Sequence, residues 1–241
     1  MFIIKDLSLT LPEDKKTVLK DIHLEFEQGE FVGVVGPSGG GKSMLLRCLS
    51  LRESWTSGTF KMDEQIIING GGRASMKYRS QFAYLEQNPE LYGEKTALKN
   101  VLIGQKGQTP WWRRLTGMVR SDDYMGAMDE LERFGLLDKA KLPAGKLSGG
   151  EKQRVAISRA LVHGANVLAA DEPVVGLDPQ TADKVLSELK SLCQNKGKTV
   201  ITVLPVDLAE RWCTRLWGIK EGRLLWDITG RRLTSAEKNS I

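Results

Sequence analysis

The stretch Gly36-Pro37-Ser38-Gly39-Gly40-Gly41-Lys42-Ser43 decides the fold class of this 241-residue chain. It follows a continuous apolar run over residues 31–35, which is typical of a strand buried on both faces. A helix is expected to begin at Lys42, and glycines placed before a helix N-terminus let backbone N–H groups converge on phosphate oxygens. The pattern predicts a phosphate-binding loop in which Lys42 reaches the β- and γ-phosphates of a nucleotide and the Ser43 hydroxyl binds Mg²⁺. A glycine-rich turn that binds nothing is the alternative, and the strand and helix on either side disfavour it.

Two adjacent acids, Asp171-Glu172, follow a second short apolar segment over residues 167–170. The carboxyl ends of parallel strands form the edge at which α/β sheets bind ligands, so we expect both acids beside the phosphate loop. Asp171 would hold the Mg²⁺ shell, and Glu172 would orient or deprotonate the attacking water. A helix cap followed by a surface acid is the structural alternative.

Strands alternate with helices along most of the chain, which predicts an α/β protein with a parallel sheet. Alternating apolar and polar residues over 2–11 and around 22–26 predict additional antiparallel strands, and Glu221-Gly222 predicts a terminal hairpin. Helical spacing over 96–103 and 123–137 indicates a mostly helical middle region. The second of these helices is expected to place four apolar residues on one face: Met125, Met128, Leu131 and Phe134.

The composition narrows the function classes. The formal net charge is +5, but 35 basic residues are interleaved with 30 acidic ones, so a mixed solvated surface is expected and no nucleic-acid partner. No apolar stretch approaches the roughly 20 residues that span a bilayer, and the first residues lack a secretory pattern. We therefore expect a cytoplasmic protein forming one domain over residues 1–241, with reduced thiols at its three cysteines.

The segment Leu147-Ser148-Gly149-Gly150-Glu151, followed by Lys152-Gln153-Arg154, is a second candidate phosphate site. A serine and two glycines at a helix start offer a hydroxyl, backbone N–H groups and the helix dipole to an anion, although they also form a good helix cap. The segment resembles the signature of the ABC family of ATP-binding proteins. In that family the signature acts in trans, so the resemblance implies a head-to-tail dimer that sandwiches two ATP molecules.

Two shorter motifs extend the resemblance over essentially the whole chain. Gln87 matches the glutamine that in this family contacts Mg²⁺ and links the nucleotide site to the membrane partner. Asp178, in Gly176-Leu177-Asp178-Pro179, matches the loop that crosses the dimer interface, although an Asp-Pro helix start has the same letters. The resemblance implies a P-loop NTPase fold of the ABC type, with an antiparallel β subdomain and an inserted helical subdomain at about residues 88–160.

Two positions depart from the family pattern. Pro205 stands where the family carries a switch histidine that contacts the γ-phosphate, and Leu11 stands where it often stacks an aromatic ring on adenine. A proline offers neither a side-chain nor a backbone N–H donor. Loss of one such contact in a phosphoryl-transfer site costs on the order of 10²–10³-fold in rate, which predicts slow hydrolysis or help from a partner subunit.

A narrower resemblance, to phosphonate- and phosphite-import ATP-binding subunits, is carried by residues 103–105, 109–115 with the following helix, and 211–215. It implies an Mg²⁺-dependent ATPase on the inner face of the membrane that drives import of a phosphonate-like anion. Its implied partners are transmembrane permease subunits, a second ATP-binding subunit in a homodimer or heterodimer, and a substrate-binding protein. The alternative is a regulatory or structural ATP-binding module, and an aromatic patch that only packs is the alternative for 109–115.

Overall fold

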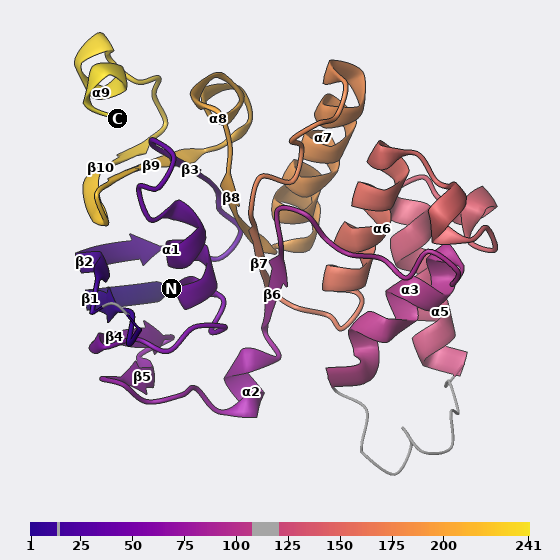
Figure 1. Ribbon diagram of the computed structural model, residues 1–241, viewed down its shortest axis with the longest axis horizontal. Helices are drawn as coiled ribbons and strands as arrows, with labels where there is room; N and C mark the ends of the chain where they lie inside the picture. The colour runs from indigo at the N-terminus through magenta and orange to yellow at the C-terminus, as the bar shows by residue number, and fades with distance from the viewer. Residues whose placement is uncertain (14, 108–120) are drawn as a thin grey trace.

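The computed structural model describes residues 1–13, 15–107 and 121–241, which form two sheets and a group of helices (Figure 1). The segment 109–115, which carries part of the narrower resemblance, lies outside the described residues. The strands are β1 (Phe2–Thr10), β2 (Thr17–Phe26), β3 (Phe31–Val35), β4 (Ser57–Met62), β5 (Gln65–Asn69), β6 (Phe82–Leu85), β7 (Val167–Ala170), β8 (Thr199–Val203), β9 (Arg215–Lys220) and β10 (Arg223–Thr229). The helices are α1 (Lys42–Leu49), α2 (Met76–Arg79), α3 (Ala97–Ile103), α5 (Ser121–Arg133), α6 (Gly149–Leu161), α7 (Pro179–Lys196), α8 (Val206–Trp212) and α9 (Ser235–Ser240), with 3₁₀ turns η1 (Gly104–Gly107), η2 (Leu137–Lys139) and η3 (Ala144–Lys146).

The larger sheet has the order β10-β9-β3-β8-β7-β6, and its strands β9, β3, β8, β7 and β6 run parallel. Every residue of β3, β7 and β8 is buried, as expected for strands covered on both faces. The predicted parallel sheet is therefore confirmed. Because β3, β7 and β6 run in one direction, the segments that follow them, which carry the phosphate loop, the acid pair and Gln87, meet at the same edge.

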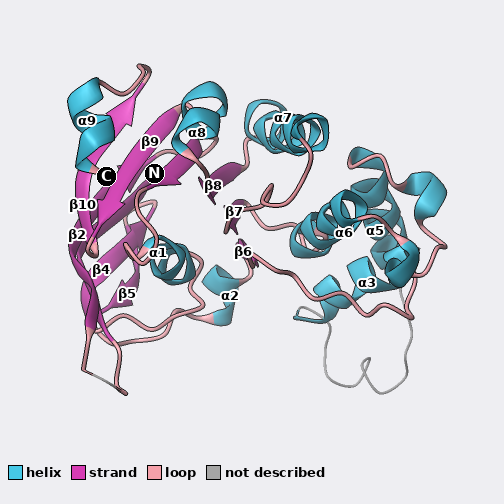
Figure 2. Ribbon diagram, turned by 45° about the horizontal axis from the view of Figure 1, so that its top comes forward, coloured by secondary structure: helices cyan, strands magenta, loops and turns pink. Residues whose placement is uncertain are grey.

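The smaller sheet has the order β2-β1-β4-β5 and is antiparallel throughout. The predicted early strands belong to it. Its inner face packs aromatic rings against the larger sheet, and the rings of Phe2 and Phe26 stack with centroids 4.7 Å apart. Helix α1 lies between the two sheets, so the helix that begins at the phosphate loop is enclosed by strands (Figure 2).

Helices α3, α5 and α6 form a separate group on the other side of β6 (Figures 1 and 2). They share their own apolar core, which includes Val101, Leu131 and Val155. This arrangement agrees with the inserted helical region that the resemblance implies. Helix α6 also packs against β6 and α7, which joins the helical group to the parallel sheet.

The prediction of a helix over 123–137 is wrong in two respects. It places the end of the helix too late, and it places one exposed residue on the buried face. Gly135 has φ +64°, the left-handed conformation that terminates helices, so α5 stops at Arg133. Leu131 and Phe134 are buried as expected, and Met128 packs partly against the core. Met125 is 56% exposed, because six positions of a 3.6-residue helix turn it away from Leu131.

Among the described residues, no helix is both long enough and apolar enough to cross a membrane.

Candidate nucleotide-binding site

The glycines of the phosphate loop are required by close backbone contacts. Gly36 has φ +148°, and a Cβ placed there would lie 1.9 Å from the carbonyl oxygen of Ile219. Gly222, at the tip of the β9–β10 hairpin, donates its N–H to the Gly40 carbonyl over 2.9 Å. The loop therefore lies between the start of α1 and this hairpin. Backbone contacts with Ile219 and Gly222 determine its shape.

Substitution of Gly36 by alanine is expected to destabilise the protein by roughly 3 kcal/mol or more, because a positive φ and a clash with a carbonyl act together. Gly39 is the matched control. Its φ is +74°, but a Cβ there meets no atom within 4 Å. Gly39→Ala is expected to cost only about 1 kcal/mol, from the backbone conformation alone. Urea unfolding of both variants measures the difference between their free energies of unfolding. Equal losses of stability would show that the close contact with Ile219 does not determine the shape of the loop.

The side chain of Lys42 lies over the loop. Its Nζ donates to the carbonyl oxygens of Gly36 and Pro37 over 2.9 and 2.8 Å. Burial lowers the pKa of Lys42, whereas the negative charges of Glu172 and Asp171 act in the opposite direction. The three predicted residues therefore share one electrostatic environment, in which the ammonium stands between the loop and the acid pair.

Asp171 follows β7 and is 4% exposed, and its N–H donates to the Leu85 carbonyl of the neighbouring strand over 2.9 Å. Its carboxylate accepts a hydrogen bond from the Ser43 hydroxyl and one from Tyr84, whose Oη lies 3.4 Å from Oδ2. Burial raises the pKa of Asp171, and the Ser43 hydrogen bond opposes that shift. The structure thus brings together the two residues that the sequence predicts for the Mg²⁺ shell.

Glu172 adopts φ +48°, an uncommon conformation for a residue other than glycine. Its Oε2 accepts a hydrogen bond from Gln87 Nε2 at 2.6 Å. The hydroxyl of Ser43, the carboxylate of Asp171 and the amide oxygen of Gln87 are hard oxygen donors of the type that Mg²⁺ prefers. The residues present therefore fit that ion.

The predicted signature forms the start of α6. Ser148 is the N-cap and forms a capping box with Glu151: the Glu151 N–H donates to Ser148 Oγ over 3.3 Å, and the Ser148 N–H donates to Glu151 Oε2 over 2.9 Å. A Cβ on Gly149 would meet nothing within 4 Å, so the backbone of the helix start is open. Glu151, which also pairs with Lys139, has a local structural role. Leu147 is buried in the helical group.

The signature and the phosphate loop do not come together within one chain. Helix α1 packs in the core beneath the smaller sheet, whereas α6 packs on the opposite face of the larger sheet (Figure 2). The action of the signature in trans, across a head-to-tail dimer, stays a prediction.

Asp178 is the N-cap of α7, and its Oδ1 accepts the Thr181 N–H over 3.0 Å, with Pro179 as the first helical residue. The preceding Val175 is 52% exposed, so this segment presents an apolar side chain to the surface. This capping role alone is a sufficient structural reason for an aspartate at position 178. Its role at a dimer interface stays a prediction.

Substitutions at Asp178 separate these two roles. Asp178→Ala is expected to lower the thermal unfolding midpoint by a few degrees, because the Thr181 N–H loses its acceptor, whereas Asp178→Asn retains a capping oxygen. Thr181 lowers the pKa of Asp178, so the stabilisation by the charged cap is complete above the ordinary aspartate pKa and is lost as the pH falls through the lowered value. Calorimetry of both variants between pH 2 and 7 measures this. An Asn variant as unstable as the Ala variant at pH 7 would contradict the capping role.

The two departures from the family pattern have ordinary local surroundings. Pro205 follows β8 as the N-cap of α8, and its carbonyl accepts the Ala209 N–H over 2.9 Å. Leu11 follows β1, is half-buried, and donates its N–H to the Lys16 carbonyl over 2.9 Å. Their effects on hydrolysis and adenine binding stay predictions.

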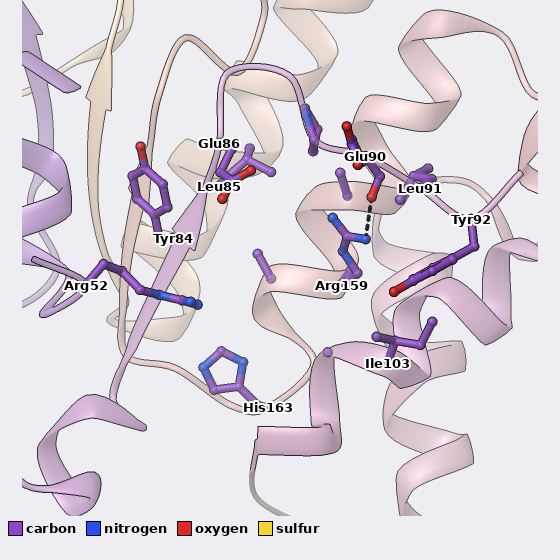
Figure 3. Close-up of a pocket in the computed structure, with 14 residues that line it drawn as sticks. Arg52, Tyr84, Leu85, Glu86, Glu90, Leu91, Tyr92, Ile103, Arg159 and His163 are labelled. Carbon is purple, nitrogen blue, oxygen red and sulfur yellow. Dashed lines mark hydrogen bonds between the residues drawn. The ribbon is translucent and has the colours of Figure 1, made fainter. Parts of the chain in front are cut away.

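A cavity of about 520 Å³ separates the end of β6 from the helical group (Figure 3). Tyr84 and Arg52 lie on the sheet side, and Arg159, Tyr92 and Ile103 lie on the helical side. Arg159 donates to the Glu90 carbonyl over 2.7 Å, and both residues line this space. No pattern in the sequence predicts this cavity, because its walls come from segments as far as about 110 residues apart. We call it the interlobe cavity.

A preformed phosphate loop with an acid pair beside it defines the class of P-loop nucleotide-binding proteins. The family model of ABC transporters matches residues 19–175. The chain belongs to that family, and it is an ATP-binding, ATP-hydrolysing subunit of an ABC transporter.

Two kinds of relative support this assignment. The chain is 39% identical to the phosphonates import ATP-binding protein PhnC of Staphylococcus aureus (strain bovine RF122 / ET3-1) over 87% of this chain and 82% of that one, and 38% identical to the strain USA300 protein over the same shares. It is 28% identical to a solved dimeric ATP-binding cassette in a post-hydrolysis state bound to ADP and Pi. That comparison covers 97% of this chain and 100% of the other, with a TM-score of 0.80. A nucleotide-free cassette, 22% identical with a TM-score of 0.83 over 100% and 94% of the chains, shows the same fold.

Proposed function

We propose that this chain is the ATPase subunit of an importer of phosphonate-like anions. The observation that carries the proposal is the identity of 39% over 87% of the chain to a phosphonates import ATP-binding protein, together with a site that holds the parts needed for ATP hydrolysis. The proposed functional unit is a single ATP-binding domain over residues 1–241, with a helical subdomain at about 88–160. Its relatives give no support to the regulatory alternative.

The proposed roles within one chain follow from the contacts of the site. The loop from Gly36 to Ser43 binds the ATP phosphates with its N–H groups, and Lys42 leaves its two carbonyl contacts to bind the β- and γ-phosphates. Ser43, Asp171 and Gln87 would hold Mg²⁺, which would neutralise charge on the phosphates. Glu172, which Gln87 holds at 2.6 Å, orients the attacking water and accepts its proton.

The proposed second half of the site comes from the signature of a partner ATP-binding subunit. Ser148 and Gly149 lie at the open N-terminus of α6, where the helix dipole and free N–H groups favour an anion. Gly150 is confined, because a Cβ there would lie 2.7 Å from Thr181 Cγ2. In the proposed dimer, the signature of one subunit is therefore a rigid element that contacts the ATP phosphates bound to the other subunit.

The interlobe cavity is the proposed contact site for a transmembrane permease subunit. Its lining includes Glu86, the chain neighbour of Gln87, whose match in the family links the nucleotide site to the membrane partner. Tyr92 on its helical side is 55% exposed. The chain would then lie in the cytoplasm on the inner face of the membrane. A substrate-binding protein completes the proposed importer on the other side.

Growth of the source organism on methylphosphonate as the sole phosphorus source tests the proposal. Deletion of the gene is expected to abolish this growth and to leave growth on inorganic phosphate unchanged. Wild-type protein, but not Lys42→Ala, is expected to restore growth, and a tagged copy is expected to co-purify with a membrane permease. Undiminished growth of the deletion strain on methylphosphonate would overturn the proposed cargo.

A further inference from the structure

Tyr84 connects the interlobe cavity to the acid pair. Alternation along β6 places Phe82 and Tyr84 on the face of the sheet that packs against α1, and alternation along β7 places Asp171 on the same face. The side chain of Tyr84 packs partly against the core and also lines the cavity near Arg52 (Figure 3). One residue therefore borders both the proposed permease contact site and the proposed metal site.

The Tyr84 hydroxyl has a defined contact. Its Oη lies 3.4 Å from Oδ2 of Asp171, a long hydrogen bond to a carboxylate that is almost completely buried. Burial and the nearby Asp171 raise the pKa of Tyr84 to about 12, so the hydroxyl keeps its proton at neutral pH and donates. Asp171 then has two hydroxyl donors, Ser43 and Tyr84, which lie on different elements.

Two donors restrain a carboxylate more than one does. Ser43 is itself a proposed metal ligand, so its hydrogen bond to Asp171 has to change when Mg²⁺ binds. Tyr84 has no such role and can hold Oδ2 throughout. Outer hydrogen bonds of this type fix the orientation of a metal-binding carboxylate and raise its affinity for the ion.

We propose that the Tyr84 hydroxyl is a positioning group for Asp171, so that Mg²⁺ binding in this chain depends on a residue of the interlobe cavity. The inference rests on the proposed function, because it takes Asp171 as a metal ligand. It adds a second connection between cavity and metal site beside that of Gln87, since a partner seated against Tyr84 would displace its hydroxyl from Asp171.

Metal binding without turnover tests the role of Tyr84. The variants Tyr84→Phe and Tyr78→Phe are made in a Glu172→Gln background, which keeps ATP intact. Tyr78 is the matched control, because its hydroxyl lies 2.6 Å from Gln65 Oε1 and makes no contact with the acid pair. Electron paramagnetic resonance measures the affinity of each protein for Mn²⁺ in the presence of ATP. Calorimetry measures ATP binding without metal and thermal stability.

Tyr84→Phe is expected to weaken Mn²⁺ binding about 10-fold while metal-free ATP binding and thermal stability stay unchanged. Tyr78→Phe is expected to bind Mn²⁺ like the background protein. Equal Mn²⁺ affinity in both variants would overturn the inference and leave the proposed function standing. A Tyr84→Phe variant that loses stability and keeps its Mn²⁺ affinity would also overturn it, because the hydroxyl would then be structural. Failure of the background protein to bind Mn²⁺ with ATP would instead contradict the proposed site.

Discussion

Glu172→Gln is expected to lower the rate of ATP hydrolysis by about 10²–10⁴-fold, because glutamine cannot accept a proton from the attacking water. The substitution keeps the size of the side chain and leaves an oxygen that can accept the Gln87 hydrogen bond. ATP affinity should therefore be retained, and the variant should accumulate as an ATP-bound dimer. Phosphate release measures the rate, and size-exclusion chromatography with ATP measures the dimer.

Glu132→Gln is the control for this experiment. Glu132 is an exposed residue of α5 in the helical group, so the same chemical change there should leave both the rate and the dimer as in the wild type. A Glu172→Gln variant that hydrolyses ATP at the wild-type rate would show that another group activates the water. A low rate caused by Pro205 would be recognised separately, as slow phosphate release from both the wild type and Glu132→Gln.

A mixture of two inactive variants is expected to recover activity if the signature acts in trans. Lys42→Ala removes the charge from the phosphate loop. Ser148→Asp keeps a good N-cap for α6 but places a carboxylate against the incoming phosphate, so the variant should fold normally and hydrolyse ATP at least 10²-fold more slowly. A dimer with one subunit of each kind has one site in which the loop and the signature are both intact.

Random pairing makes about half of the dimers mixed, and one of their two sites is intact, so about a quarter of the wild-type activity is expected. Phosphate release after equimolar mixing measures it. The control is the Lys42→Ala chain mixed with a chain that carries both substitutions, because no dimer in that mixture has an intact site. No recovery in the first mixture would place the phosphate loop and the signature in the same chain, against the geometry described above.

The sequence sufficed to predict the elements that carry the site. The run before Gly36 and the segment before Asp171 are apolar on both faces, and such strands can only form a covered parallel sheet. From that sheet, the meeting of Lys42, Ser43, Asp171 and Glu172 at one edge follows directly. The helix over 123–137 was predicted less well, because Gly135 ends it and periodicity alone does not reveal a left-handed residue.

The role of Tyr84 could not be predicted, for a physical reason. In the sequence, Tyr84 is an aromatic residue in a short strand, a pattern that indicates packing of its ring in the core. Its partner Asp171 lies 87 positions further along the chain. Only the pairing of β6 with β7, with Tyr84 opposite Ala169, brings the two side chains together. The interlobe cavity depends in the same way on how the helical group lies against the sheet.

The contact of the β9–β10 hairpin with the phosphate loop bears on how nucleotide leaves the protein. Gly222 donates to Gly40 and accepts from the Lys20 N–H over 2.8 Å, so backbone hydrogen bonds tie the loop to the smaller sheet. A loop held in this way has already lost its conformational entropy on folding, and nucleotide binding need not order it again. In the proposed head-to-tail dimer, a loop held in this way would not release ADP by opening, so release would follow separation of the two subunits.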